Sequence, residues 1–123
     1  HIPVEEWESP SPGSVAAVIF RQPPVPALFF GLGERGKPSE RVADDAADEA
    51  IAFRDAKAPV DPHSADQLLL PLAFSDDASE YRTSEVTPHL TTNIATVTRF
   101  TDRGIRIEDG QGKTGVVRIA ARV

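Results

Sequence analysis

The residue best suited to do chemistry in this sequence is His89, which follows Thr87 and Pro88 where a helix is expected to begin. Thr is a favoured N-cap, Pro suits the first helical position, and apolar residues follow at helical spacing at 90, 94 and 97. The free N–H groups and positive dipole end of a first turn favour a neutral, nucleophilic imidazole facing a phosphate. An ordinary surface histidine is the other interpretation, and this stretch alone does not decide between them.

A second group of polar side chains falls at the start of another expected helix. Asp61 is its predicted N-cap and Pro62 its first residue. His63, Asp66 and Gln67 then share one face near the positive end of the helix dipole. Polar residues on an exposed first turn need no functional explanation, so the pattern predicts a shared face and leaves its role open.

Two other patterns suggest a ligand, and both have simpler explanations. Residues 31–37 contain glycines and a lysine but lack the spacing of a phosphate loop, so we expect a strand-to-helix turn with Ser39 as N-cap. The acidic residues of the following helix share one face, which predicts a solvated surface and not a metal site. The opposite face is predicted to contain Val42, Ala43, Ala46, Ala47, Ala50, Ile51 and Arg54.

Periodicity predicts the elements that position these motifs. We expect strands at 14–21 and 27–32, a turn with three prolines at 22–26, helices at 40–57, from 62 and from 88, a strand at 80–86, and a closing hairpin of 104–108 and 114–120. Pro71 should kink or end the second helix. The predicted core residues of that helix are Ala65, Leu68, Leu69 and Leu72, with Val60 packing on Ala65. The predicted fold class is α+β, built from two-layer sheet-and-helix units.

Composition narrows the classes of function. The 123 residues have 40% hydrophobic content, and no apolar run approaches the roughly 20 residues that span a bilayer. We therefore expect no membrane partner, no export signal and a cytoplasmic location. The absence of cysteine excludes disulfides and thiolate metal sites, and the net charge of −6 argues against a general nucleic-acid coat protein. The lack of methionine and the start at His1 predict a fragment or a processed chain.

Three motifs, in this order, give the sequence a specific resemblance to a known family. They are GLGERGKPSERVA at 31–43, VDPHSADQLLLPLA at 60–73 and TPHLTTN at 87–93. Together they resemble RNA 3'-terminal phosphate cyclase, from about Ser11 to Val117, over the C-terminal third or so of a family member. The resemblance implies part of a repeated two-helix, four-strand cyclase domain plus half of a small inserted α/β domain. Residues 1–57 would be the C-terminal half of the insert, and residues 58–123 the C-terminal part of the catalytic domain.

The resemblance also implies a reaction and a site. Family members convert an RNA 3'-phosphate end to a 2',3'-cyclic phosphodiester in an ATP-dependent, ligase-class reaction that passes through a histidinyl-AMP. His89 matches the nucleophile, Asp66 and Gln67 match residues at the ATP site, and His63 matches a ring that can stack on adenine. The implied ligands are ATP, the RNA end and a divalent Mg or Mn ion. We assign no metal ligand and no DNA partner to this chain.

Several expected parts of the family's site have no counterpart in these residues. The metal-binding carboxylate and the basic residues for triphosphate and RNA would belong to the missing N-terminal part of the cyclase, so the 123 residues alone are expected to be inactive. Two alternatives stay open. One is a non-catalytic, cyclase-like interaction or scaffold domain in RNA processing or ribosome assembly, and the other is a small free-standing module that binds ATP by itself.

Overall fold

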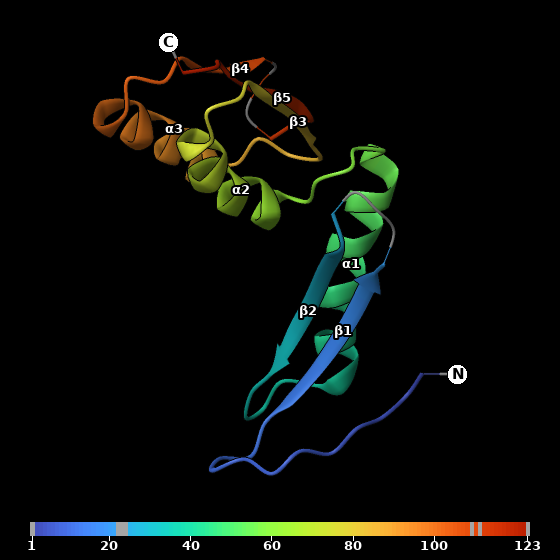
Figure 1. Ribbon diagram of the computed structural model, residues 1–123. Helices are drawn as coiled ribbons and strands as arrows, with labels where there is room; N and C mark the ends of the chain where they lie inside the picture. The colour runs from blue at the N-terminus through green and yellow to red at the C-terminus, as the bar shows by residue number, and fades with distance from the viewer. Residues whose placement is uncertain (1, 22–24, 109, 111, 123) are drawn as a thin grey trace.

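The protein, described by a computed structural model over residues 2–21, 25–108, 110 and 112–122, consists of two sheet-and-helix groups that follow one another along the chain (Figure 1). The element order is β1 (Ser14–Phe20), β2 (Ala27–Gly33), α1 (Ser39–Ala56), α2 (Pro62–Phe74), β3 (Ser79–Thr83), α3 (Pro88–Phe100), β4 (Ile105–Glu108) and β5 (Gly115–Ile119). Within the described residues, three helices and two small antiparallel sheets confirm the predicted α+β class.

The first group, which we call the hairpin unit, consists of β1, β2 and α1. The two strands pair antiparallel, with Val18 opposite Phe29, and α1 packs against them. Because side chains alternate along a strand, Ala27 and Phe29 of β2 share one face and are both buried. A Cβ at Gly31 would lie 1.9 Å from the Val42 carbonyl oxygen, so glycine is required where the strand meets the helix.

Among the described residues, side chains are packed on one face of the hairpin and exposed on the other. On the α1 side, the Phe53 ring lies 5.3 Å, centroid to centroid, from both Phe20 and Phe29, in edge and tilted arrangements that aromatic pairs prefer. The large apolar side chains of the opposite face are exposed. They are Val15, Ile19, Leu28, Phe30 and Leu32. The hairpin unit therefore has a small aromatic core on one side and an open apolar surface on the other.

Helix α1 differs from the prediction at its start and on its inner face. Its N-cap is Pro38, without a side-chain cap hydrogen bond, so the predicted Ser39 cap is wrong and Ser39 is the first helical residue. The buried residues are Val42, Ala46 and Ala50, with Phe53 partly buried beside them. Three residues predicted on this face are exposed, namely Ala43, Ile51 and Arg54. The predicted face was too wide, because a helix lying on a two-stranded hairpin buries only a narrow stripe.

The second group, which we call the motif unit, contains α2, β3, α3, β4 and β5. Its strands pair antiparallel in the order β3-β5-β4, and Val60 adds one parallel bridge to Thr83 in β3. Helices α2 and α3 pack against each other and cover one side of this sheet (Figure 1). The buried core contains Val60, Ala65, Leu69, Ala73, Tyr81, Leu90, Val97, Val117 and Ile119. This larger core holds together the two helices that carry the sequence motifs.

Two boundaries in the motif unit correct the prediction. Helix α2 continues past Pro71 to Phe74, so Pro71 does not end it. Ala73 beyond the proline is fully buried, and this packing offsets the backbone hydrogen bond that a proline cannot donate. Strand β3 ends at Thr83 and not at 86, because Thr83 Oγ1 donates to the Glu85 carbonyl at 3.0 Å and the chain turns there toward α3. The proline turn predicted at 22–26 lies largely outside the described residues.

Candidate functional site

The start of α2 fixes the first group of polar residues. The Asp61 carboxylate accepts hydrogen bonds from the backbone N–H of His63 at 2.9 Å and of the next residue at 3.0 Å, and Asp61 is 2% exposed. With Pro62 as the first helical residue, the predicted helix start is confirmed. His63, Asp66 and Gln67 occupy the first two turns, where His63 and Gln67 are exposed and Asp66 is partly buried.

The start of α3 carries the histidine of the third motif, His89. Thr87 Oγ1 accepts from the Leu90 N–H at 3.2 Å and Pro88 is the first helical residue, which confirms the predicted cap. Leu90 is fully buried, whereas His89 beside it is exposed. The buried neighbour anchors the first turn, and the imidazole is left at the surface at the positive end of the helix dipole. This environment is favourable for an anion such as a phosphate.

A side-chain hydrogen bond joins the two helices between the motifs. Asn93 Nδ2, one helical turn after His89, donates to Asp66 Oδ1 at 2.5 Å. Residues i and i+4 lie on the same face of a helix, so His89 and Asn93 share the face that approaches α2. The structure thereby brings the carboxylate of one motif to the helix that carries the histidine of the other.

The first turn of α2 is also anchored from the sheet. The Tyr81 hydroxyl in β3 donates to the Ala65 carbonyl at 2.7 Å, directly beside Asp66. Burial raises the pKa of Tyr81, and the negative charge of Asp66 raises it further. Tyr81 therefore stays protonated and remains a donor at any physiological pH. Asp66 is held between a fixed backbone and the Asn93 amide.

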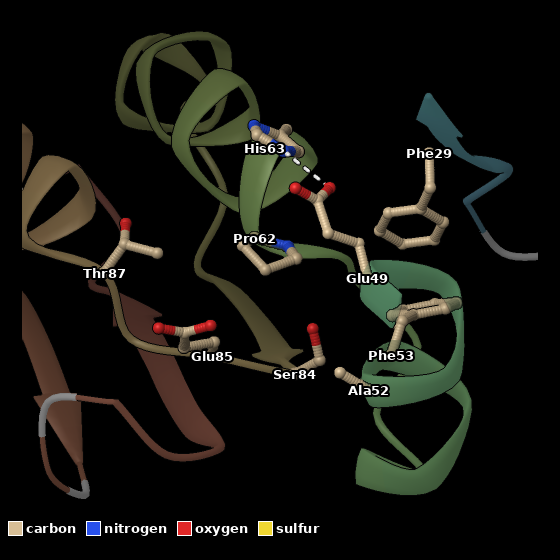
Figure 2. Close-up of a pocket in the computed structure, with 9 residues that line it drawn as sticks. All are labelled: Phe29, Glu49, Ala52, Phe53, Pro62, His63, Ser84, Glu85 and Thr87. Atoms are coloured by element: carbon tan, nitrogen blue, oxygen red, sulfur yellow. Dashed lines mark ion pairs between the residues drawn. The ribbon is translucent and has the colours of Figure 1, made fainter. Parts of the chain in front are cut away.

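His63 lies apart from this contact, at a cavity between the two units (Figure 2). The cavity has a volume of about 260 Å³ and is lined by Phe29, Glu49, Ala52, Phe53, Pro62, His63, Ser84, Glu85 and Thr87. Figure 2 shows the Glu49 carboxylate of α1 pointing toward the His63 ring, and Glu49 Oε2 lies 3.8 Å from His63 Nε2. Aromatic walls and polar rims of this kind suit a planar, partly polar ligand.

The cavity and the Asp66–Asn93 contact are separate features of one region. Asp66, Gln67 and His89 do not line the cavity, but Thr87, two residues before His89, does. The Ser84 hydroxyl at the cavity wall is buried without a hydrogen-bond partner among the described residues. Asp66 is thus hydrogen-bonded to α3, and His63 lies near Glu49 of α1. Gln67 and His89 are exposed at the surface.

The glycine-containing segment before α1 has a structural explanation. Lys37 Nζ donates to the Leu32 carbonyl at 3.0 Å and pairs with Asp45 at 2.6 Å. The Lys37 ammonium is therefore paired within the hairpin unit. The close approach of β2 to α1 explains why position 31 is a glycine. Both observations favour the strand-to-helix turn over a phosphate loop.

The described residues contain neither a cluster of metal-binding side chains nor a membrane-spanning helix. Among the described residues there is no group of three or more His, Cys, Asp or Glu side chains that could hold a metal ion. We assign no chemical step to the divalent ion that the resemblance implies, whose protein ligands are expected outside these residues. In the same part of the chain, no helix is long and apolar enough to cross a membrane.

Several residues that the structure brings into this region had no predicted role. Asn93 belongs to the third motif, and its spacing of four from His89 was the signal that it shares the histidine's face. Glu49 was assigned only to a solvated surface. The cavity residues Phe29, Phe53 and Ser84 come from distant segments, and no local pattern indicated that they meet at His63.

The geometry defines an α+β protein in which one core holds two capped helices that present an exposed histidine and a bonded carboxylate–amide pair. The family model of RNA 3'-terminal phosphate cyclase matches residues 7–107. The chain therefore belongs to the RNA 3'-terminal phosphate cyclase family, as the three motifs had indicated.

Curated relatives agree, and they are much longer than this chain. An RNA 3'-terminal phosphate cyclase of Trichormus variabilis is 47% identical over 58% of this chain and 21% of its own length. One from Methylococcus capsulatus is 41% identical over 76% of this chain and 26% of its own length. One from Thermococcus gammatolerans is 36% identical over 98% of this chain and 35% of its own length. The chain thus spans between about a fifth and about a third of these relatives.

Proposed function

We propose that this chain is part of an ATP-dependent enzyme of the ligase class that converts an RNA 3'-terminal phosphate to a 2',3'-cyclic phosphodiester. In this proposal residues 1–57 are the C-terminal half of an inserted domain and residues 58–123 are the C-terminal part of the catalytic domain. The rest of the site, including the metal ligands and the basic residues that hold triphosphate and RNA, comes from an N-terminal part outside these residues. The substrates are ATP and the RNA end.

The observation that carries the proposal is the bond between Asp66 and Asn93. It joins the motif assigned to ATP with the motif assigned to the nucleophile, and it lies one turn from His89. Without this contact, only the order of the two motifs in the sequence would relate them to each other. With it, a nucleotide held at α2 would place its phosphates near the α3 start, where the exposed His89 lies at the positive end of the helix dipole.

The reaction divides into three displacements at phosphorus. First, a neutral ring nitrogen of His89 attacks the α-phosphorus of ATP, a P–N bond forms, and pyrophosphate leaves with the electrons of the broken P–O bond. Second, an oxygen of the RNA 3'-phosphate attacks the same phosphorus, and the released imidazole recovers its electron pair. Third, the neighbouring 2'-OH attacks the 3'-phosphorus, loses its proton and expels AMP, which closes the ring.

The cavity beside His63 supports a position for the adenine ring. The imidazole of His63 offers one stacking face, and base stacking on such rings contributes roughly 1 to 3 kcal/mol. The phenylalanines of the hairpin unit supply apolar walls, while Glu49 and Glu85 provide acceptors for an exocyclic amine. Gln67, exposed one turn beyond His63, completes the proposed nucleotide contacts.

The test is covalent labelling of the full-length protein that contains these residues. With α-labelled ATP and Mg or Mn ions, we expect an acid-labile label on His89 that is absent from His89→Ala. The matched control is His63→Ala, which removes a histidine from the nucleotide site but keeps the nucleophile. It should still be labelled at saturating ATP, with an ATP requirement raised by about 5- to 150-fold, as the loss of stacking predicts.

Two results would contradict the proposal in different ways. Equal labelling of wild type and His89→Ala would show that His89 is not the nucleophile. A folded full-length protein with no label on any histidine would favour the non-catalytic interaction or scaffold function. Heat of ATP binding to residues 1–123 alone would instead support the small nucleotide-binding module.

A further inference from the structure

The hydrogen bond between α2 and α3 has a geometry that suggests more than helix packing. Asn93 and His89 are four residues apart in α3 and share one face, while Asp66 lies beside Gln67 at the proposed nucleotide site. The bond engages only Oδ1 of Asp66, so Oδ2 remains available to another donor. One side chain thus contacts the nucleotide-binding carboxylate from the helix that carries the nucleophile.

We infer that Asn93 is a positioning residue, whose amide orients the Asp66 carboxylate and sets its separation from His89. The inference rests on the proposed function. In the adenylylation step the α-phosphorus must lie in line with the imidazole, and small displacements of bound reactants lower rates strongly. A donor fixed on α3 ties the position of the nucleotide to that of the histidine, so that both move together.

The amide of Asn93 is suited to this task by its chemistry. Asp66 as a carboxylate only accepts hydrogen bonds, so its partner must be a donor. A lysine or arginine would also donate, but its positive charge would neutralise the carboxylate and attract the phosphates that should approach His89. Both Asn93 and Asp66 are partly buried, which limits competition by water and keeps the bond directional.

The fold does not depend on this bond. Helix α2 is already anchored by the buried Leu69 and by the bond from Tyr81 to the Ala65 carbonyl, and α3 is anchored by Leu90 and Val97. Removal of the Asn93 amide should therefore leave the helices packed while freeing the Asp66 carboxylate to rotate. This separates a positioning role, which changes the rate of reaction, from a structural role, which changes stability.

The experiment measures single-turnover labelling of His89 in the full-length protein with α-labelled ATP. We expect Asn93→Ala to lower the rate constant at saturating ATP by about tenfold or more. The ATP concentration for half-maximal rate and the unfolding temperature should change little, by less than about threefold and about 2 °C respectively. The matched control is Thr96→Ala, in the next turn of α3, because Thr96 is exposed and its hydroxyl bonds only to the Thr92 carbonyl of its own helix. It should keep the wild-type rate.

A double-mutant cycle tests whether Asn93 acts through Asp66. In an Asp66→Ala background, followed long enough to measure slow labelling, Asn93→Ala should change the rate by less than about twofold. A further tenfold loss in that background would overturn the inference, and so would a wild-type rate for Asn93→Ala or a loss of rate matched by a loss of thermal stability. If wild type itself carries no label on His89, it is the proposed function that fails.

Discussion

The hairpin unit and the motif unit bury their apolar residues in different ways. In the motif unit, nine buried residues from both helices and the sheet form one continuous core. In the hairpin unit, α1 covers one face of two strands, while the other face exposes large apolar side chains from both strands. Free energy from burial is roughly proportional to the apolar area removed from water, so the two units derive their stability from different amounts of packing.

Because of this difference, some residues of the site are held in place by their own unit and others are not. Asp66, Asn93 and His89 stand on helices whose buried sides meet in a shared core, so their relative positions follow from that core. His63 meets α1 of the hairpin unit through an exposed contact of 3.8 Å between its Nε2 and Oε2 of Glu49. Exposed pairs contribute little, so the cavity is the less constrained part of the site.

The largest effect on stability is expected at two adjacent phenylalanines of β2. Phe29 is 2% exposed and packs on α1, whereas Phe30 is 50% exposed on the open face. We expect Phe29→Ala to lower the free energy of unfolding of this chain by about 3 to 5 kcal/mol, and Phe30→Ala to lower it by much less. Urea unfolding monitored by circular dichroism measures both. A cost for Phe30→Ala equal to that of Phe29→Ala would show that the open face is covered in solution.

The motif unit offers a parallel pair of leucines. Leu90, beside His89, is fully buried, and Leu70 of α2 is 53% exposed. Leu90→Ala should cost about 2 to 5 kcal/mol through lost contacts and a cavity, while Leu70→Ala should stay within about 1 kcal/mol of wild type. Unfolding midpoints in urea, compared at equal slope, provide the measurement. If both variants lose the same stability, α3 is not anchored by the core as described.

The sequence allowed prediction of those features that depend on neighbours along the chain. The caps at Asp61 and Thr87 and the prolines that follow them are local signals, and both helix starts are where they were expected. The features that were predicted wrongly, or left open between two outcomes, concern packing. The width of the buried face of α1 and the continuation of α2 through Pro71 depend on what lies against each helix, which its own residues do not specify.

The candidate site likewise combines features that the sequence predicts with features that it does not. The three motifs identified the polar residues, but the bond from Asn93 to Asp66 joins positions 27 residues apart, and the cavity at His63 combines both units. Such contacts arise only when the chain folds, so no local spacing predicts them. The roles of His89, His63, Asp66 and Gln67, and the division of the chain at residue 57, stay predictions.

A smaller effect is expected at the cap that begins the motif unit. The buried Asp61 carboxylate accepts from two backbone N–H groups of α2, so Asp61→Ala should lower the free energy of unfolding by about 1 to 2 kcal/mol. Asp61→Asn keeps an acceptor at the same place and is the matched control, with an expected loss of only a few tenths of a kcal/mol. Thermal unfolding of the two variants compares them. Equal losses would attribute the effect to the charge of Asp61 and not to its cap bonds.

The smallest expected effect concerns the exposed charges that join the start of α1 to the strand-to-helix turn. A hydrogen bond from the Lys37 ammonium holds the pKa of Asp45 below its ordinary value of 3.8, with attraction to Lys37 and then Arg41 adding to the shift and burial opposing it. Because the folded pKa is the lower one, this pair stabilises the fold at pH values above the ordinary pKa, and the contribution is lost as the pH falls through the lowered pKa. Lys37→Ala should therefore raise the pKa of Asp45 more than Arg41→Ala does, as measured by NMR titration of the carboxyl carbon. A larger shift in Arg41→Ala would mean that Arg41, and not Lys37, is the main partner of the Asp45 carboxylate.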